Sequence, residues 1–225
     1  MKRASLAAAA LLAAACPPAF ALELPLAGAR FNLPVASVRQ LRFGATLRQQ
    51  FDFSCGSAAL ATLLTYHYGR PVSEQRVFEH MYLNGDQNKI RKEGFSMLDM
   101  QRFLAAHGLR GDGFELPLDK LAAARLPAIV LVSERGYHHF VVIKGIANGR
   151  VLVGDPSSGA RAMPRAAFET IWLGKLLFVI HGDSGVAGFN AAADWRAAPA
   201  APLEIGIGRD APMLPVMPKL GPGDF

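Results

Sequence analysis

The 225-residue sequence has only two cysteines, no apolar run long enough to span a bilayer and no cluster of basic residues. A transmembrane helix needs about 20 consecutive apolar residues, so none is expected. The formal net charge of +6 is spread thinly and is not interleaved with aromatic residues, so nucleic-acid binding is not expected either. The chain is long enough to form one domain with a hydrophobic core.

The N-terminus has the features of a secretory signal peptide. Two basic residues precede the apolar residues 6–15, and the motif AFA at residues 19–21 offers small side chains where a signal peptidase cuts. We therefore expect residues 1–21 to be a signal peptide and the mature protein to be periplasmic. Cys16 allows an alternative, a lipoprotein cleavage site, which the two prolines directly after it disfavour.

Loss of residues 1–21 would leave Cys55 as the only cysteine, so an internal disulfide is excluded. A lone thiol in an oxidising compartment is open to oxidation, and is therefore either buried and inert or kept for its chemistry. Ser54 resembles a helix N-cap, which places Cys55 in the first turn of a helix over residues 55–68. Backbone N–H groups at such a position are expected to lower the thiol pKa.

The first half of the chain predicts helices and the second half predicts strands, which is the segregated pattern of an α+β fold. Helices are expected at residues 55–68, 73–82, 96–108, 118–125 and 164–172, and strands at 128–132, 140–146, 151–153 and 176–180. Ser96 with Asp99 resembles a capping box, Asn148-Gly149 predicts a hairpin turn, and residues 84–89 are expected to be a polar loop.

Three further segments complete the expected organisation. Residues 22–42 form an N-terminal lead-in, residues 43–182 form the patterned domain, and residues 183–225 form a tail rich in Ala, Gly and Pro. Because no apolar period survives in that tail, it is expected to be extended and not a second domain.

His139 directly precedes a run of strand residues, which would project its side chain from the strand's beginning at a defined angle. It could therefore serve as a base for Cys55. Two alternatives stand beside this reading. His138 and His139 could be a surface pair at a turn, or they could bind zinc with Cys55, although adjacent strand residues face opposite ways and the spacing is not that of a structural zinc site.

Asp155 ends the strand that the predicted hairpin pairs with the His139 strand. The hairpin would bring the two residues within hydrogen-bond reach, which would fix the imidazole tautomer and stabilise the imidazolium. The alternative is an ordinary turn aspartate before Pro156. Cys, His and Asp in this order, on a helix start and two neighbouring strands, is typical of papain-like thiol hydrolases.

The sequence resembles one family in particular. The segment around Cys55 is QQFDFSCGSAAL at residues 49–60, and it is followed by His139 before FVV and by Asp155 before a proline. These three motifs resemble those of the C39 peptidases, the bacteriocin-processing group that cuts leader peptides after a double glycine. The resemblance covers residues 47–180, and within the family it is nearest to the stand-alone exported members encoded with bacterial functional-amyloid systems. Ser54 departs from the Asp that transporter-fused members usually carry, and because the sequence has no pattern of a membrane or ATPase domain, we expect a stand-alone peptidase.

The resemblance implies a papain-like cysteine peptidase fold and a thiol endopeptidase without cofactor or metal. It implies that Cys55 is the nucleophile, His139 the base and Asp155 its orienting partner. A glutamine six residues before the nucleophile lines the family's oxyanion hole, and the match here is Gln49, with the adjacent Gln50 as the alternative. The implied partner is an exported polypeptide substrate, an amyloid subunit or a member of its secretion machinery.

Two other functions fit the same sequence. The chain could be a catalytically silent C39-like module that grips an export substrate, or it could catalyse another acyl transfer on a papain-like fold. The presence of Cys55, His139 and Asp155 together disfavours the silent module, whereas another acyl transfer on the same fold stays open.

Overall fold

The structure is a computed structural model that describes residues 21–26, 29–34, 36–181 and 188–199. The chain divides into two units, Met1–Ser37 and Val38–Phe225. In the first unit, strands β1 (Ala21–Leu26) and β2 (Ala29–Pro34) pair antiparallel, where the sequence predicts only a lead-in. Apart from Ala21, the expected signal peptide lies outside the described residues.

The second unit contains a six-stranded sheet in the order β3-β8-β4-β5-β6-β7, with every neighbouring pair antiparallel. Its strands are β3 (Arg110–Glu115), β4 (Ala128–Glu134), β5 (Tyr137–Ala147), β6 (Arg150–Asp155), β7 (Gly159–Pro164) and β8 (Leu176–His181). The hairpin between β5 and β6 turns at Asn148 and Gly149, both with positive φ, which confirms the predicted turn.

The helices are short and most precede the sheet in the chain. They are α1 (Val38–Phe43), α2 (Cys55–Thr62), the π-helix η1 (Leu63–His67), α3 (Glu74–Asn84), α4 (Gln87–Glu93), α5 (Met97–Ala106), α6 (Leu118–Ala124), α7 (Arg165–Ile171) and α8 (Ala192–Trp195). The predicted capping box of Ser96 and Asp99 opens α5. Helices followed by an antiparallel sheet confirm the predicted α+β class.

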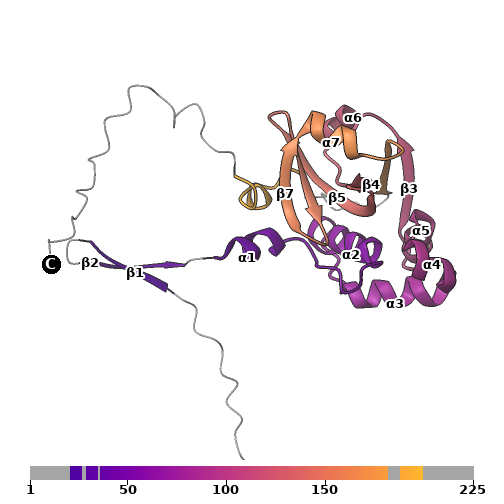
Figure 1. The fold of residues 1–225 in the computed structure, drawn as a ribbon, viewed down its shortest axis with the longest axis horizontal. Helices are drawn as coiled ribbons and strands as arrows, with labels where there is room; N and C mark the ends of the chain where they lie inside the picture. The colour runs from indigo at the N-terminus through magenta and orange to yellow at the C-terminus, as the bar shows by residue number, and fades with distance from the viewer. Residues whose placement is uncertain (1–20, 27–28, 35, 182–187, 200–225) are drawn as a thin grey trace, which may run out of the picture. The chain divides into compact units, whose positions relative to one another are not determined.

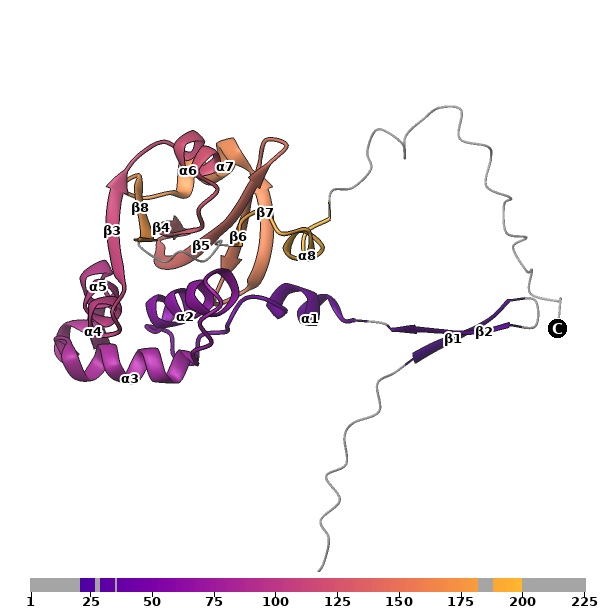
Figure 2. The same ribbon diagram turned by 180° about the vertical axis from the view of Figure 1, so that it is seen from behind.

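The sheet is covered on both faces, and strand β5 shows how its residues divide between two cores. Phe140 and Val142 pack in the core formed with α2, α3 and α5. Val141 and Ile143 belong to the second core, which includes residues of α6 and α7. This alternation follows from the period of two along a strand. Figure 1 and, from behind, Figure 2 show α2 to α5 gathered on one side of the sheet and α6 with α7 on the other.

Several elements differ from the sequence predictions. The helix expected at residues 55–68 widens into η1, where the Tyr68 N–H bonds to the Leu63 carbonyl. Residues 84–89, expected to be a loop, include the start of α4, because the Asp86 carboxylate accepts hydrogen bonds from the N–H groups of Asn88 and Lys89. Strands β3 and β7 have no counterpart in the prediction.

Residues 188–199, here called the C-terminal strap, fall in the predicted tail yet pack against the rest of the second unit. Phe189 is buried in the second core. The fully buried Lys144 of β5 donates from Nζ to the Asp194 carboxylate at 2.8 Å and to the Ala45 carbonyl at 2.7 Å. The buried His67 contacts the Gly188 carbonyl. The remainder of the predicted tail, at residues 183–187 and 200–225, lies outside the described residues.

Within the described ranges, no helix combines the length and apolarity that crossing a bilayer requires.

Candidate active site

Cys55 is the first residue of α2, as the sequence predicts, but Ser54 does not cap the helix with its side chain. The Ser54 hydroxyl instead turns back to Phe51, accepting from its N–H at 3.1 Å and donating to its carbonyl at 3.0 Å. These bonds close the loop before Cys55. The backbone N–H groups of the first helical turn are therefore not occupied by the Ser54 side chain.

The Cys55 thiol is buried, with 6% of the residue exposed, and accepts from the Phe140 N–H at 3.5 Å. Burial raises the pKa of the thiol, and hydrogen bonds from the Phe140 and Gly56 backbones only partly offset that rise. The expectation of a lowered thiol pKa is therefore wrong for the resting protein, because desolvation outweighs the helix start. Burial thus favours the neutral form of the thiol, so its ionisation depends on a base at the site.

His139 begins the buried part of β5, and its Nε2 lies 3.1 Å from Oδ2 of Asp155 at the end of β6. Both side chains are 3% exposed. Since an ionised carboxylate can only accept, the imidazole donates from Nε2, which leaves Nδ1 as the ring's basic nitrogen. Among the described residues, no group hydrogen-bonds to Nδ1, which is buried. The adjacent His138 is exposed.

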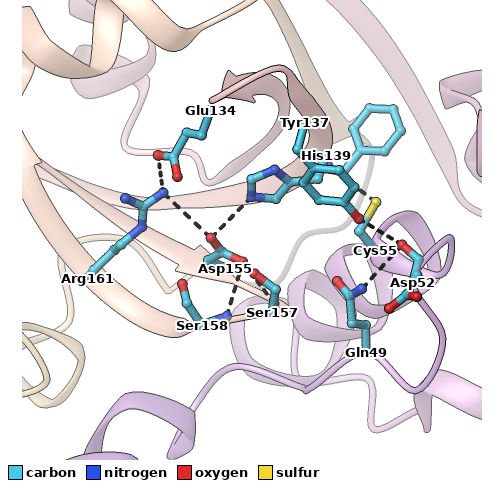
Figure 3. A network of polar contacts seen from close by, with 11 residues as sticks. Gln49, Asp52, Cys55, Glu134, Tyr137, His139, Asp155, Ser157, Ser158 and Arg161 are labelled. Atoms are coloured by element: carbon cyan, nitrogen blue, oxygen red, sulfur yellow. Dashed lines mark hydrogen bonds and ion pairs between the residues drawn. The ribbon is translucent and has the colours of Figure 1, made fainter.

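The other oxygen of Asp155, Oδ1, is held by the turn that follows β6. It accepts from the Ser157 N–H at 2.8 Å, the Ser157 hydroxyl at 2.7 Å and the Ser158 N–H at 3.3 Å. Burial alone would raise the pKa of the carboxyl, but the hydrogen bonds from His139 and Ser157 outweigh burial and lower that pKa. Asp155 is thus a fixed, ionised acceptor for His139 (Figure 3).

Gln49 lies in the segment before α2, where its amide Nε2 donates to the Phe51 carbonyl at 3.0 Å and to the Asp52 carbonyl at 3.4 Å. Its backbone N–H donates to the Pro156 carbonyl, directly after Asp155. Gln50 is exposed. The structure therefore ties Gln49, not Gln50, to both the Cys55 loop and the Asp155 turn, with its amide engaged by backbone carbonyls.

Two residues near these groups, Tyr137 and Arg161, are not among the site residues that the sequence predicts. Tyr137 stacks on the His139 ring, with centroids 5.3 Å apart, and its hydroxyl donates to the Asp52 carbonyl at 2.8 Å. Its place two residues before His139, on the same face of a strand, was a usable signal. Arg161 lies 3.6 Å from Asp155 Oδ2, but it sits on the unpredicted strand β7, so no signal pointed to it.

Cys55 and His139 open into one cleft with a volume of about 590 Å³. Most of its walls are apolar or backbone groups: Gly94, Phe95, Met97, Leu131, Phe140, Leu173, Gly174 and Leu176. Glu93, Ser96 and His138 supply its polar edge. A thiol and a free imidazole nitrogen on one apolar cleft can perform acyl transfer on a carbonyl substrate.

No three His, Cys, Asp or Glu side chains gather as a metal-ligand set anywhere in residues 36–181 or 188–199. The zinc alternative therefore has no ligand geometry in this part of the chain.

Comparison with known proteins agrees with this chemistry. The model of the peptidase C39 family matches residues 45–184, which contain Gln49, Cys55, His139 and Asp155. A protein of Pseudomonas fluorescens named probable functional amyloid protease FapD is 39% identical over 187 residues, 81% of each chain. Its namesake from Pseudomonas aeruginosa is 42% identical over 146 residues, 65% of each chain.

A solved structure shares the fold. The peptidase domain of Streptococcus ComA, a bifunctional ABC transporter of a quorum-sensing pathway, superposes with a TM-score of 0.51. It is 23% identical and covers 60% of this chain and 96% of its own. From the family match over more than half of its length, the chain belongs to the peptidase C39 family and is a cysteine peptidase.

Proposed function

We propose that this chain is an endopeptidase in which Cys55 is the nucleophile, His139 the general base and acid, and Asp155 the group that orients His139. The observation that carries the proposal is the buried 3.1 Å His139–Asp155 hydrogen bond at the cleft that Cys55 also lines. It leaves the imidazole with one basic nitrogen, Nδ1, for the proton of the thiol.

The reaction begins from a neutral thiol. As a peptide carbonyl approaches Sγ, Nδ1 takes the thiol proton, sulfur bonds to the carbonyl carbon, and an electron pair moves onto the carbonyl oxygen. The proton then passes from Nδ1 to the leaving nitrogen as the C–N bond breaks, leaving a thioester. A water molecule that gives its proton to Nδ1 hydrolyses the thioester and restores the thiol. Asp155 accepts from Nε2 throughout and stabilises the imidazolium.

The charged carbonyl oxygen would lie near the start of α2, where the Cys55 N–H can donate to it. Gln49 is the second proposed donor. Its bond to the Asp52 carbonyl, at 3.4 Å, is the longer of its two and is the one that a substrate oxygen would replace. The oxyanion hole would thus be completed by substrate binding.

The substrate class follows from the cleft and from the relatives. The apolar cleft can receive an extended polypeptide segment with apolar side chains. Because the FapD relatives are named functional amyloid proteases, we propose an exported substrate that is an amyloid subunit or part of its secretion machinery. The features of residues 1–21 support cleavage in the periplasm.

An unbiased cleavage assay tests this proposal. The purified protein and its Cys55→Ala variant are each incubated with the exported proteins of a bacterium that forms such amyloid, and new peptide N-termini are sequenced. We expect N-termini that appear with the native chain only. If substrates bind to both proteins and neither cuts, the chain is a binding module; identical cleavage by both proteins would exclude Cys55 as the nucleophile.

A further inference from the structure

Asp155 has a charged neighbour, Arg161, which is itself paired with Glu134. Arg161 on β7 places Nη2 3.6 Å from Asp155 Oδ2, the same oxygen that accepts from His139. The same nitrogen donates to Glu134 at the end of β4. Figure 3 shows the resulting row, from His139 through Asp155 and Arg161 to Glu134. One guanidinium nitrogen is therefore shared between two carboxylates.

The contacts are unequal. Glu134 is within hydrogen-bond reach of Nη2, whereas Asp155 Oδ2 is beyond it. Arg161 thus acts on Asp155 through its charge, and the hydrogen bond on Oδ2 is left to His139. If Glu134 were absent, the guanidinium would be free to move onto Oδ2 and compete with the imidazole.

Titratable and charged groups surround the Cys55–His139 pair from several elements, and Glu93 of α4 and His138 of β5 also line its cleft. Cys55 lies on α2, Tyr137 on β5, Asp155 on β6, Arg161 on β7 and Glu134 on β4. Arg161 is the permanent cation of this group, and Glu134 is the anion that balances it. An ion pair that is about 30% exposed contributes little to stability by itself, so holding β4 to β7 does not account for this placement.

We propose that Arg161 and Glu134 are positioning residues of opposite sign, which set the pH range over which the Cys55–His139 pair works. This inference rests on the proposed function of that pair. Arg161 disfavours an extra proton on the pair, and Glu134 favours it while keeping Arg161 off Oδ2.

The sign of each effect does not depend on which of the two groups titrates first. Removing a positive charge favours every protonated state of a coupled pair, so Arg161→Gln should move the whole pH profile to higher pH. Removing a negative charge does the reverse, so Glu134→Gln should move it to lower pH. We expect shifts of about half a pH unit at low ionic strength. They should shrink with added salt, because both side chains are about 30% exposed.

The alkylation of Cys55 by iodoacetamide reads these shifts without any need for a peptide substrate. Rates are measured from about pH 5 to about pH 10 on the full chain carrying Cys16→Ser, so that Cys55 is its only thiol. Arg161→Lys should keep the profile of the parent. Arg165→Gln is the matched control, because its partners Asp119 and Glu169 do not line the cleft. It begins α7 four residues beyond Arg161, about 13 Å along an extended chain.

Opposite shifts in Arg161→Gln and Glu134→Gln, with none in the control, would support the inference, even if the cleavage assay found no substrate. Unshifted profiles in both variants, shifts of the same sign, or an equal shift in Arg165→Gln would overturn it. If Arg161→Gln does not fold, Glu134→Gln alone decides by the sign of its shift. His139→Ala tests the proposed function separately: if it leaves the profile unchanged, the Cys55–His139 pair itself is wrong.

Discussion

Strand β5 carries two buried polar pairs whose surroundings differ. Near its start, His139 bonds to Asp155 and lines an open cleft, with one ring nitrogen left unpaired among the described residues. Five residues further, Lys144 bonds to Asp194 and to the Ala45 carbonyl and is fully buried. Burial lowers the pKa of the Lys144 ammonium, and the attraction of Asp194 opposes that effect. The first pair can exchange a proton with a ligand, whereas the second can only hold the C-terminal strap on the sheet.

Burial of a charged pair therefore does not by itself mark a catalytic site, because Lys144 and Asp194 are buried without lining the Cys55 cleft. What distinguishes His139 is a basic nitrogen without a hydrogen-bond partner among the described residues, in a cleft that the Cys55 thiol also lines. Substitutions in the two pairs should therefore separate activity from stability.

The largest loss of cleavage activity is expected on substitution of His139. His139→Ala removes the proposed base for the Cys55 thiol, whose pKa burial raises, so cleavage should fall by at least about 10⁴-fold with the fold retained. His138→Ala should keep most activity, because that side chain is exposed and not bonded to Asp155. Steady-state cleavage rates of both variants check this. A greater loss in His138→Ala would reverse the assignment of the base.

The second-largest loss of turnover is expected for Asp155→Asn. The amide loses the charge that stabilises the imidazolium and can present a donor where His139 needs an acceptor, so turnover should fall by about 10²–10⁴-fold. The Michaelis constant should change little, because Asp155 contacts His139 and the Ser157 turn and does not line the cleft. A change confined to the Michaelis constant would place Asp155 in a substrate subsite.

The pH dependence of stability gives the same residue a second test. The pKa of Asp155 is lowered in the folded state, so its contribution to stability is complete above its ordinary value of 3.8 and is lost as the pH falls through the lowered pKa. Urea unfolding of the native protein and of Asp155→Asn should therefore differ most at neutral pH and converge in strong acid. A difference that grows as the pH falls would contradict the ionised state.

Asp194→Asn is the matched substitution in the other pair and should show the opposite outcome. It leaves Lys144 buried without a counter-charge, which should lower the free energy of unfolding by roughly 3 kcal/mol and the melting temperature by about 6–12 °C. Cys55 alkylation, measured below the transition, should stay normal. The double variant Lys144→Met/Asp194→Leu should recover most of the stability. A loss of activity in Asp194→Asn without a loss of stability would connect the strap to catalysis.

The sequence correctly predicts the parts of the fold that are determined by residues close together in the chain. The Asn148-Gly149 turn and the Ser96 capping box were predictable because the side chains and backbone conformations act within a few residues. Strand β3 was not, because Gly111 is its only buried residue and its place is set by pairing with β8. The strap was missed for a similar reason, since the partner of Asp194 is 50 residues away.

The candidate active site likewise has residues that local sequence patterns predict and properties that depend on the whole fold. Cys55, His139 and Asp155 lie at the ends of elements that the pattern reveals, and the hairpin joins two of them. The raised pKa of the Cys55 thiol was not predictable, because it depends on how deeply the whole fold encloses the sulfur. Arg161 stayed hidden because it reaches Asp155 from a strand with no clear apolar alternation.

Gln49→Ala should cost about 10²–10³ in turnover, the usual effect of removing one oxyanion donor. Cys55 should still be alkylated at about its normal rate, because the Cys55–His139 pair is untouched. Gln50→Ala is the matched control and should lower turnover less than about tenfold, because its side chain is exposed. Collapse of alkylation in Gln49→Ala would instead assign Gln49 a structural role in the loop that its amide bonds hold together.

The smallest effect is expected at Tyr137, which contacts both sides of the site without a proposed part in proton transfer. Tyr137→Phe keeps the ring over His139 and loses the hydroxyl, which donates to the Asp52 carbonyl and also contacts the Gln49 side chain. A neutral hydrogen bond on a 45% exposed side chain contributes about 1 kcal/mol or less, so turnover should fall by no more than about fivefold. Tyr137→Leu also removes the ring contact, which adds about 0.5–1.5 kcal/mol and should bring the loss to about tenfold or more. Turnover and Cys55 alkylation are measured together, so that a displaced Cys55 loop is told apart from a displaced imidazole. If Tyr137→Phe were as inactive as His139→Ala, the Tyr137 hydroxyl would take part in the reaction. The proposal that only Cys55 and His139 transfer the proton, with Tyr137 in a supporting role, would then be wrong.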